Sequence, residues 1–464
     1  MTNDAIPINA SRPVTEAFLP SRNRAVYSLG VLLLGYIFSI MDRQVLTLLI
    51  GPIQQSLQIN DSWMGILHGF TFALFYSIVG LPIARLIDRG NRRLIITVGV
   101  GLWCLATAAS GLATEFWHLL LARACVAVGE AVLLPGAVSL ISEFFTPQKR
   151  GRALGVLGTA GPFGAGIGLL STGLVLGYFT NHPLTLPLLG QLEPWQLTLM
   201  CIGLPGLVVL VLMQGVPEPR KKRGSLTKKV EASSLSIPVS EVYAYLRINK
   251  RSFIGIMIGA GCFYAATYGA SSWLPTYFVR EYGWTYTRIG TWMGLILCIC
   301  SPLGVMLASS LGEYWRNRGI VNGNLRVAIL VCAALLLVSP PLLLSNNPNI
   351  ALIFVALLAT LWFCLLGIGP ALIIEMSPLP MRGQFIALFT GALNFIGAGI
   401  GPVSVGLLTD YVLSDPADIK YAILIVTIVS SLLGCAFFVS ARKSFAASTR
   451  SAQKWQSPSK ISSE

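Results

Sequence analysis

The chain has 464 residues, of which 54% are hydrophobic and only 11% are charged. Soluble domains carry about 25% charged residues, so this composition excludes an ordinary water-soluble protein and indicates a lipid environment. The formal net charge is +14, which by itself would favour an acidic partner such as nucleic acid. The positions of the basic residues along the chain favour a different explanation.

Apolar runs of about 20 residues recur along the whole chain, and each is long enough to cross the hydrocarbon layer of a bilayer as a helix. A membrane β-barrel would show short alternating segments instead. We therefore predict an all-α integral membrane protein with twelve transmembrane helices. Their expected bounds are 26–50, 63–84, 93–113, 117–140, 152–177, 196–215, 252–279, 287–311, 326–345, 350–373, 383–409 and 421–440.

The longest polar break separates six spans from six. The predicted parts are a cytoplasmic N-terminal arm, a six-helix bundle, a cytoplasmic linker, a second six-helix bundle and a disordered cytoplasmic tail, at residues 1–25, 26–215, 216–251, 252–440 and 441–464. The linker carries the basic run 220–223. The linker sequence from Ser240 onward predicts a short interfacial helix, with Val242, Tyr243 and Leu246 facing lipid.

The basic residues follow this predicted topology. With the odd-numbered connections outside, the inner segments hold 28 of the 33 Lys and Arg residues, the outer segments three and the helix interiors two. This asymmetry is the positive-inside rule, and it predicts that both termini are cytoplasmic. The net charge therefore reflects topology and attraction to anionic lipid rather than binding of nucleic acid.

An internal repeat relates the two halves. Residues 143–151 and 375–383, offset by 232 positions, both begin with Glu and end with Arg-Gly, and each is followed by a glycine-rich helix. The glycines of 158–168 favour either helix movement or close packing in a rigid bundle. Parallel repeats of this kind predict a substrate site between the halves, near the membrane midplane.

Four charged residues fall in the interior of the predicted spans, away from the span ends, and all are in the N-terminal half: Asp42 and Arg43 in the first span, and Arg123 and Glu130 in the fourth. Each costs roughly 2.5–3.5 kcal/mol at a helix centre unless it is paired or hydrated. Arg123 and Glu130 are two turns apart and share a helix face. Counted from the outer ends of their helices, Asp42 and Arg123 are expected at a similar depth. Asp42 and Arg123 are therefore close enough in depth to pair, and Glu130 is expected nearer the midplane.

These four charges have two interpretations. Burial disfavours an ionised carboxylate and a neighbouring Arg favours it, so a change in geometry or hydration can make Asp42 or Glu130 take up or release a proton. The two acids would then couple proton movement to transport. The alternative is a static quartet that joins the two helices. We favour the first interpretation because intramembrane charges usually serve function.

The equivalent positions of the C-terminal half, Val355 and Trp362, carry no acid or base, so proton coupling is expected in one half only. The C-terminal half is expected to supply a substrate wall of side chains with apolar bodies and hydrogen-bonding tips, namely Tyr264, Tyr268, Trp362 and Asn394. Helix packing is the alternative for each of them. Trp273 and Tyr277 are expected in the interfacial aromatic belt.

The inner connection between the second and third spans contains Asp88, Arg89, Arg92 and Arg93. Asp88 is placed to face a helix N-terminus, while the arginines are expected to anchor in the head-group layer. Topogenic anchoring alone would explain the arginines but not the acid. We therefore expect this segment to act as a gating motif that stabilises one closed arrangement of the halves.

These residues carry a resemblance to a known family. The segment 80–93 resembles the first signature of the major facilitator superfamily, G-x-x-x-D-R-x-G-R-R, although Ala84 and Asn91 stand where glycines are common. This resemblance covers nearly the whole chain. Features of the first five helices resemble the bacterial Spinster-like branch more narrowly, namely the Asp42-Arg43 pair, Arg123 with Gly129-Glu130-Ala131, and the run 150–154.

The resemblance implies the major facilitator fold, with two pseudo-symmetric six-helix bundles, and secondary active transport by alternating access. It implies Asp42 and Glu130 as proton carriers, with Arg43 and Arg123 as their partners or as an anchor for an anionic group. Spinster relatives carry amphipathic lipids such as lysophospholipids and sphingosine-1-phosphate. Small organic acids are equally compatible with the bacterial members.

Two other functions are weighed against this one. A proton-driven exporter of drugs or metabolites would use the same elements. A membrane-embedded enzyme would need a nucleophile or metal cluster, whereas His68, His118 and His182 stand without a clustered acid, so this reading is disfavoured. No cofactor or metal is expected. The expected partners are an amphipathic or anionic small molecule, protons and the bilayer, with a monomer acting in the bacterial inner membrane.

Overall fold

The computed structural model describes residues 20–187, 190–219 and 238–455. Nearly all of these residues are helical. The N-terminal half comprises α1 (Arg22–Leu57), α2 (Asp61–Gly65), the π-helix η2 (Ile66–Phe70), α3 (Thr71–Arg89), α4 (Arg92–Ser110), α5 (Phe116–Glu130), α6 (Leu133–Phe144), α7 (Pro147–Gly158), α8 (Ala160–Asn181), the short antiparallel strands β1 (Thr185–Leu186) and β2 (Gly190–Gln191), α9 (Pro194–Gly203), the 3-10 helix η3 (Leu204–Leu207) and α10 (Val208–Met213).

The C-terminal half follows the same plan after a short helix. It comprises α12 (Val239–Ile248), α13 (Lys250–Tyr282), α14 (Tyr286–Asn317), α15 (Gly323–Leu343), α16 (Pro348–Trp362), α17 (Cys364–Glu375), η5 (Leu379–Met381), α18 (Arg382–Ala392), the π-helix η6 (Leu393–Ile400), α19 (Gly401–Leu407), the π-helix η7 (Leu408–Leu413), η8 (Pro416–Asp418) and α20 (Ile419–Lys454). Some spans are built from two or more consecutive elements.

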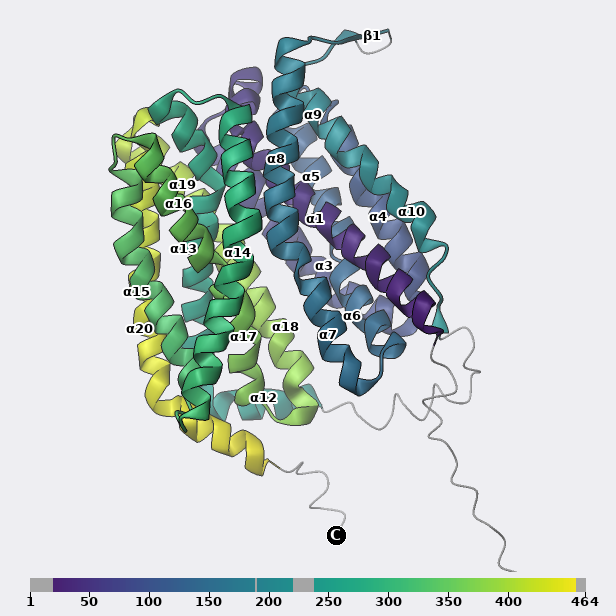
Figure 1. The fold of residues 1–464 in the computed structure, drawn as a ribbon, viewed down its shortest axis with the longest axis vertical. Helices are drawn as coiled ribbons and strands as arrows, with labels where there is room; N and C mark the ends of the chain where they lie inside the picture. Colours follow the sequence, from purple (N-terminus) through teal and green to yellow (C-terminus); the bar gives the residue numbers. More distant parts are fainter. Residues whose placement is uncertain (1–19, 188–189, 220–237, 456–464) are drawn as a thin grey trace, which may run out of the picture.

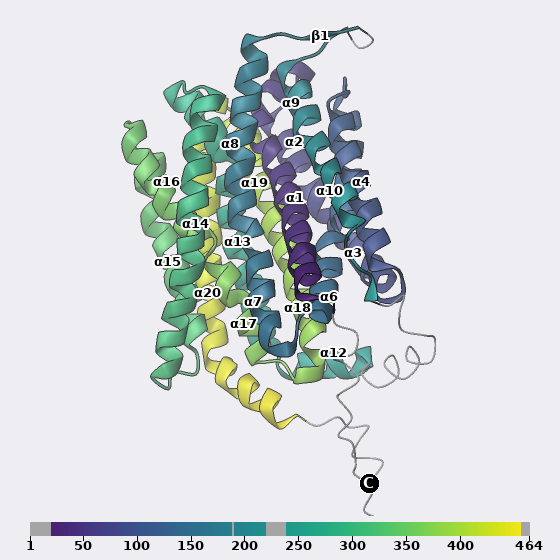
Figure 2. The same cartoon turned by 45° about the vertical axis from the view of Figure 1, so that its right-hand side comes forward.

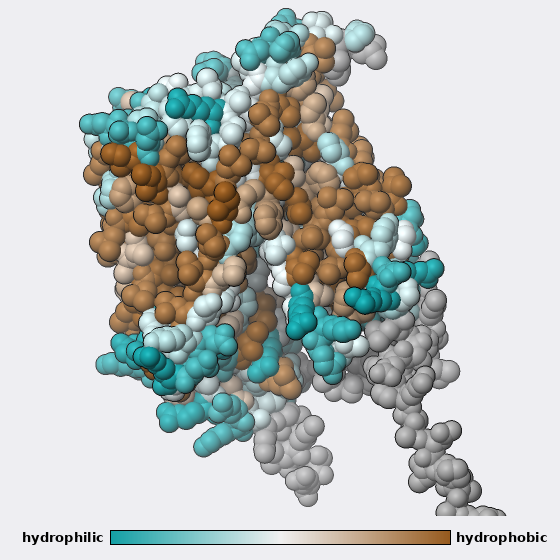
Figure 3. Space-filling model, viewed as in Figure 1, coloured by the Kyte–Doolittle hydropathy of each residue, from teal (hydrophilic) through white to brown (hydrophobic). Residues whose placement is uncertain are grey.

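Twelve helical segments of the described chain are long and apolar enough to cross a membrane. Each predicted span overlaps one of them, so the predicted fold class and number of spans are confirmed. The space-filling view shows an apolar band between two hydrophilic ends (Figure 3). This pattern arises because the exposed side chains of the band face lipid, whereas the ends face water and head groups.

The two helical bundles lie side by side and converge at one end of the molecule (Figures 1 and 2). We call this end, where α1 ends and α2 begins, the closed end. The opposite end, which carries Arg22 and Lys454, is the open end. In the space-filling view a groove separates the two halves toward the open end (Figure 3).

Glycines make the closed end possible. A Cβ atom added at Gly294 of α14 would lie 2.7 Å from the carbonyl oxygen of Gly166 of α8, and one added at Gly65 would lie 2.8 Å from the carbonyl oxygen of Pro402. Real Cβ atoms do not approach backbone oxygens so closely, so the helices of the two halves are in direct backbone contact there. The absence of side chains at these positions allows that approach.

Two expectations about flanking regions need correction. The tail is not disordered up to Lys454, because α20 continues that far and buries Phe445 and Ser448 against the protein. The linker helix α12 turns Val242 inward, 6% exposed, rather than toward lipid. Its Tyr245 hydroxyl donates to the carbonyl of Met376 at 3.0 Å, and burial raises the pKa of this hydroxyl. The basic run 220–223 lies outside the described residues.

Trp273 and Tyr277 do not belong to an interfacial belt. Both are buried, at 1% and 0% exposure. The Trp273 indole donates to the carbonyl of Pro402, 3.0 Å away, and the Tyr277 hydroxyl lies 2.8 Å from that of Tyr282. The expectation was wrong because hydropathy gives the depth of a residue but not the direction in which its helix face points.

Candidate functional site

A buried ion pair joins α1 to α5. Nε of Arg43 donates to Oε2 of Glu130 at 2.6 Å, and Oγ of Ser39 donates to the same oxygen at 2.9 Å. Glu130 is 1% exposed. A buried ion pair stabilises a protein only where good geometry and further hydrogen bonds offset the loss of water, and here both donors converge on one carboxylate oxygen.

A second ion pair lies beside the first. Nη1 of Arg123 donates to Oδ2 of Asp42 at 3.0 Å, while the Thr107 hydroxyl donates to Oδ1 at 2.5 Å. Asp42 and Arg123 are each 3% exposed. The structure therefore brings together the four charges that the sequence singled out, as two pairs that each link α1 to α5.

Several buried polar atoms of this cluster have no hydrogen-bond partner among the described residues. They include Oε1 of Glu130 and both Nε and Nη2 of Arg123. Buried polar groups in proteins are normally satisfied, so unsatisfied ones that sit together indicate a place for a proton, water or ligand. The cluster thus has free acceptor and donor capacity in a protected position.

Aromatic side chains surround Arg43. Its guanidinium carbon lies 4.4 Å from the ring centre of Phe72 and 5.2 Å from that of Tyr76. From the other half, Tyr264 and Tyr268 stack on each other with ring centres 6.1 Å apart, and both are close enough to Arg43 to interact with its charge. A cation among aromatic faces offers both electrostatic and apolar contacts to a ligand.

The other two expected substrate contacts have local surroundings of their own. Trp362 ends α16, at a helix break that matches the break after Glu130 in the repeat, and its indole nitrogen has no partner among the described residues. The Asn394 amide donates to the carbonyl of Thr390 at 3.0 Å. No described hydrogen bond or ring contact joins either residue to the charge cluster.

Sequence reasoning missed three residues of the site. Ser39 and Thr107 bind the carboxylates directly, but a single hydroxyl in an apolar run gives no signal of its own. His68 was set aside because no acid lies near it in the sequence. Its ring centre lies 6.0 Å from that of Tyr268, and its Nδ1 has no partner among the described residues. It therefore lies where the two halves meet.

A polar cluster fastens the closed end, and the sequence analysis did not find it. Both Nη atoms of Arg280 donate to the carboxylate of Asp61, at 2.7 and 2.8 Å, and Gln54 donates to Asp61 at 2.6 Å. The carboxylate of Asp410 accepts from the backbone nitrogen of Ser62 at 2.6 Å. The Arg280–Asp61 and Ser62–Asp410 contacts cross between the halves, so they would have to break for this end to open.

The expected gating motif holds one half together in this structure. Arg92 is fully buried, with Nη1 2.7 Å from Glu143 and Nη2 2.7 Å from Glu218. The expected head-group anchor is therefore wrong for Arg92. The backbone nitrogen of Arg93 donates to Glu218 at 3.2 Å. Asp88 and Arg89 lie at the exposed end of α3.

Arg92 should be a large contributor to stability. In Arg92→Ala we expect the free energy of unfolding to fall by about 3 kcal/mol, because the cation bonded to two carboxylates is lost from a buried site. Thermal unfolding in detergent measures this change. The control Arg89→Ala, at an exposed position, should change stability by less than about 0.5 kcal/mol. Equal shifts in the two variants would contradict the structural role of Arg92.

The repeat places related contacts in the other half. Asn324 occupies the position of Arg92 after the shift of 232, and its amide donates to Glu375 at 2.7 Å, as Arg92 does to Glu143. The two halves thus share a backbone plan and a polar contact at the open end. They differ at the site, where only the N-terminal half carries charges.

A comparison with known families matches residues 32–402 to the model described as Major Facilitator Superfamily. The chain belongs to this superfamily. The solved structure of a bacterial homolog of the human lysosomal transporter Spinster, in an inward-facing and unoccupied conformation, matches with a TM-score of 0.76 and 22% identity, covering 95% of this chain and all of that one. The major facilitator fold and the Spinster-like resemblance are confirmed.

Curated relatives of this major facilitator have transporter names. An MFS-type efflux pump of Mycolicibacterium smegmatis is 25% identical, with 90% of this chain and 93% of the relative covered. A D-galactonate transporter of Escherichia coli is 24% identical, with 88% and 91% covered. The sphingosine-1-phosphate transporter SPNS2 of Xenopus tropicalis is 23% identical, with 94% and 85% covered. These relatives imply transport rather than catalysis.

Proposed function

We propose that this major facilitator is a proton-coupled secondary transporter of a small amphipathic or organic anion, working by alternating access. The observation that carries the proposal is the buried Glu130 carboxylate, which accepts hydrogen bonds from both Arg43 and Ser39 on one oxygen and keeps the other oxygen without a described partner. A carboxylate in this position can take up or release a proton when its surroundings change, and can break or re-form its ion pair with Arg43.

The coupling step follows from the Arg43–Glu130 contact. A proton that arrives on Glu130 neutralises the carboxylate and weakens its hold on Arg43, because a charge-assisted contact becomes a neutral one. The guanidinium is then available to an anionic group of the substrate, between Phe72 and Tyr76. Release of the proton restores the ion pair and displaces the anion. Asp42 and Arg123 form the second pair of the same device.

The substrate class is inferred from this site and from the relatives. A cation among aromatic rings suits an anion with an apolar body, such as a lysophospholipid-like molecule or an organic acid. Tyr264 and Tyr268 would contact the apolar part, with Trp362 and Asn394 as further contacts from the C-terminal half. Relatives named for sphingosine-1-phosphate and for D-galactonate support an anionic substrate.

The direction of access also belongs to this proposal. Most basic residues of the described chain lie in segments at the open end. The positive-inside rule therefore favours a cytoplasmic position for that end and both termini, in a bacterial inner membrane. Asp88, Arg89, Arg92 and Arg93 lie at this end and would gate it. The closed end, fastened by Arg280 and Asp61, would then face outward. We propose that a monomer alternates between closure at the two ends.

Export driven by protons is a second candidate, favoured by the efflux pump of M. smegmatis, whose length the chain matches almost completely. It uses the same charges with the opposite direction of substrate flow. An assay for transport in both directions separates the two candidates. In an antiporter, protons that flow down the imposed gradient drive substrate in the opposite direction, whereas in a symporter they carry substrate with them.

The experiment that tests the proposal is reconstitution in liposomes with an imposed pH gradient and a screen of amphipathic and organic anions. A gradient of one pH unit coupled to one proton should sustain about a tenfold substrate ratio. In Asp42→Asn we expect the ratio to fall to about one, because the Asp42–Arg123 pair can no longer change its charge by protonation.

Exchange of labelled for unlabelled substrate is the control for Asp42→Asn, since exchange needs a folded carrier but no net proton movement. It should persist in the variant. Undiminished gradient-driven accumulation by Asp42→Asn would remove Asp42 from the coupling device. A wild-type protein that moves its substrate without any response to the gradient would overturn proton coupling altogether.

A further inference from the structure

A groove lies at the open end of the C-terminal half, away from the charge cluster. It is lined by Trp315, Arg326, Ile329, Leu330 and Arg442, from α14, α15 and α20, and has a volume of about 290 Å³. Its residues belong to neither the proposed transport site nor the gating motif. The volume is at the lower end of that of small-molecule pockets, enough for a head group but not for a whole lipid.

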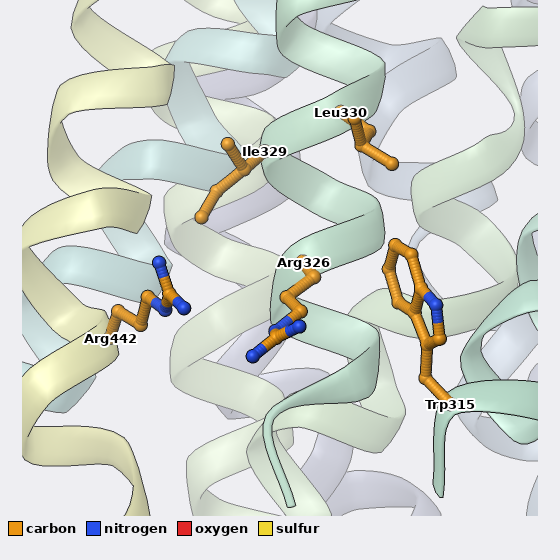
Figure 4. A pocket seen from close by; sticks show the side chains of 5 residues that line it. All are labelled: Trp315, Arg326, Ile329, Leu330 and Arg442. Atoms are coloured by element: carbon orange, nitrogen blue, oxygen red, sulfur yellow. The ribbon is translucent and has the colours of Figure 1, made fainter. Parts of the chain in front are cut away.

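Two arginines face each other across this groove. Figure 4 shows the guanidinium groups of Arg326 and Arg442 pointing into the gap between α15 and α20. Nε of Arg326 donates to Oδ1 of Asn322 at 3.2 Å, which orients the side chain. Among the described residues nothing else binds this guanidinium, and nothing binds that of Arg442. None of the five lining residues is acidic.

Like charges that point at each other are unfavourable unless an anion lies between them. The setting also favours an anion, because Arg326 lies in the first turn of α15, where the helix dipole presents its positive end. The planar guanidinium fork matches the oxygens of a phosphate, as it does those of a carboxylate. The groove thus has a positively charged end that complements a phosphate group.

The rest of the groove is apolar and faces outward. Ile329 and Leu330 follow Arg326 along α15 by about one turn, and Leu330 is 50% exposed. Trp315, at the end of α14, has the amphipathic ring that prefers the interface between head groups and acyl chains. Below the apolar band, the surface at this end is hydrophilic (Figure 3). A ligand here meets charge at the membrane surface and apolar side chains at the depth of acyl chains.

We propose that this groove binds an anionic phospholipid, with its phosphate between Arg326 and Arg442 and its acyl chains against Ile329 and Leu330. Charge complementarity selects the head group, and the apolar lining and Trp315 select a lipid over a free phosphate ion. Basic pockets between transmembrane helices on the cytoplasmic side suit such head groups. The bound lipid would bridge α15 and α20 at the open end.

Native mass spectrometry of the full-length protein in detergent tests the proposal, with phosphatidylglycerol and phosphatidylcholine added separately. The wild-type protein should retain phosphatidylglycerol in preference to phosphatidylcholine. Arg442→Gln should weaken this retention roughly tenfold, as expected for loss of one charged partner of a phosphate, and Arg442→Lys should keep most of it. The matched control Lys443→Gln changes an exposed base next to the groove and should retain the lipid as the wild type does.

Thermal unfolding separates lipid loss from misfolding. Without lipid, Arg442→Gln should unfold at the wild-type temperature. Phosphatidylglycerol should stabilise the wild type, Arg442→Lys and Lys443→Gln, but not Arg442→Gln. Equal retention of phosphatidylglycerol by Arg442→Gln and the wild type would overturn the proposal. So would equal retention of the two lipids by the wild type, or displacement of the lipid by millimolar inorganic phosphate, which would identify an ion site instead.

Discussion

Glu130→Gln is expected to abolish gradient-driven transport while leaving substrate exchange. The side chain keeps its shape and can still accept a hydrogen bond from Ser39, but it resembles the protonated acid at all times. It can therefore no longer release a proton to re-form the ion pair with Arg43, which in the structure has a length of 2.6 Å. The substrate ratio sustained by one pH unit should fall from about tenfold to about one.

The measurement is uptake into proteoliposomes with and without a pH gradient, followed by exchange of labelled substrate in the same preparation. Glu313→Gln is the matched control, because it makes the same chemical change at an exposed position at the end of α14. It should transport as the wild type does. A Glu130→Gln protein that still concentrates its substrate would show that Glu130 is a fixed structural partner of Arg43.

The alternative of a static quartet makes the opposite prediction. If the two ion pairs only join α1 to α5, Glu130→Gln should lower the stability of the protein, by loss of a charged partner in a buried site, and exchange and driven transport should decline together. The ratio between the two activities therefore decides between the interpretations. It is independent of how much folded protein the preparation contains.

Gly294→Leu is expected to prevent closure of the end that is closed in this structure. Even a Cβ atom at Gly294 would lie 2.7 Å from the backbone oxygen of Gly166 and 2.9 Å from the backbone nitrogen of Leu170. Neither atom can move away as a flexible side chain would. Overpacking of this kind costs about 1–3 kcal/mol, which shifts a two-state equilibrium by roughly 5- to 150-fold.

The expected result is a protein that folds but stays open at the normally closed end, with transport reduced by a similar factor. Spin labels at Arg152 and Gln384, on the two halves near the open end, should report a shorter distance in the variant as that end closes. Gly155→Leu is the control, because an added Cβ there meets nothing within 4 Å. An unchanged label distance with wild-type transport would show that the α8–α14 contact is not part of the conformational change.

The sequence predicted the fold because hydropathy and helix length are properties of the chain itself. Each apolar run is long enough to span the bilayer and must satisfy its backbone hydrogen bonds internally, so a helix is the only local solution in lipid. The same argument identified Asp42, Arg43, Arg123 and Glu130, since a charge in an apolar run is costly wherever its helix is placed.

Helix partners were harder to predict. Equal depth suggested that Asp42 meets Arg123, but nothing in the chain showed that Ser39 and Thr107 would complete the two pairs. The expectation that Trp273 faces the interface failed because the rotation of a helix about its axis is set by the neighbours it packs against. The expectation that Arg92 lies among head groups failed for the same reason, since Arg92 is buried between Glu143 and Glu218.

The sequence alone determined that the protein is a membrane-embedded bundle of twelve helices in two related halves, with its intramembrane charges in one of them. Tertiary structure alone decided which charges pair, how the Arg280–Asp61 cluster fastens one end, and that Arg326 and Arg442 share a groove. The reason is that burial in lipid acts on each helix separately, whereas an ion pair or a seam depends on the tilt and rotation of two helices at once.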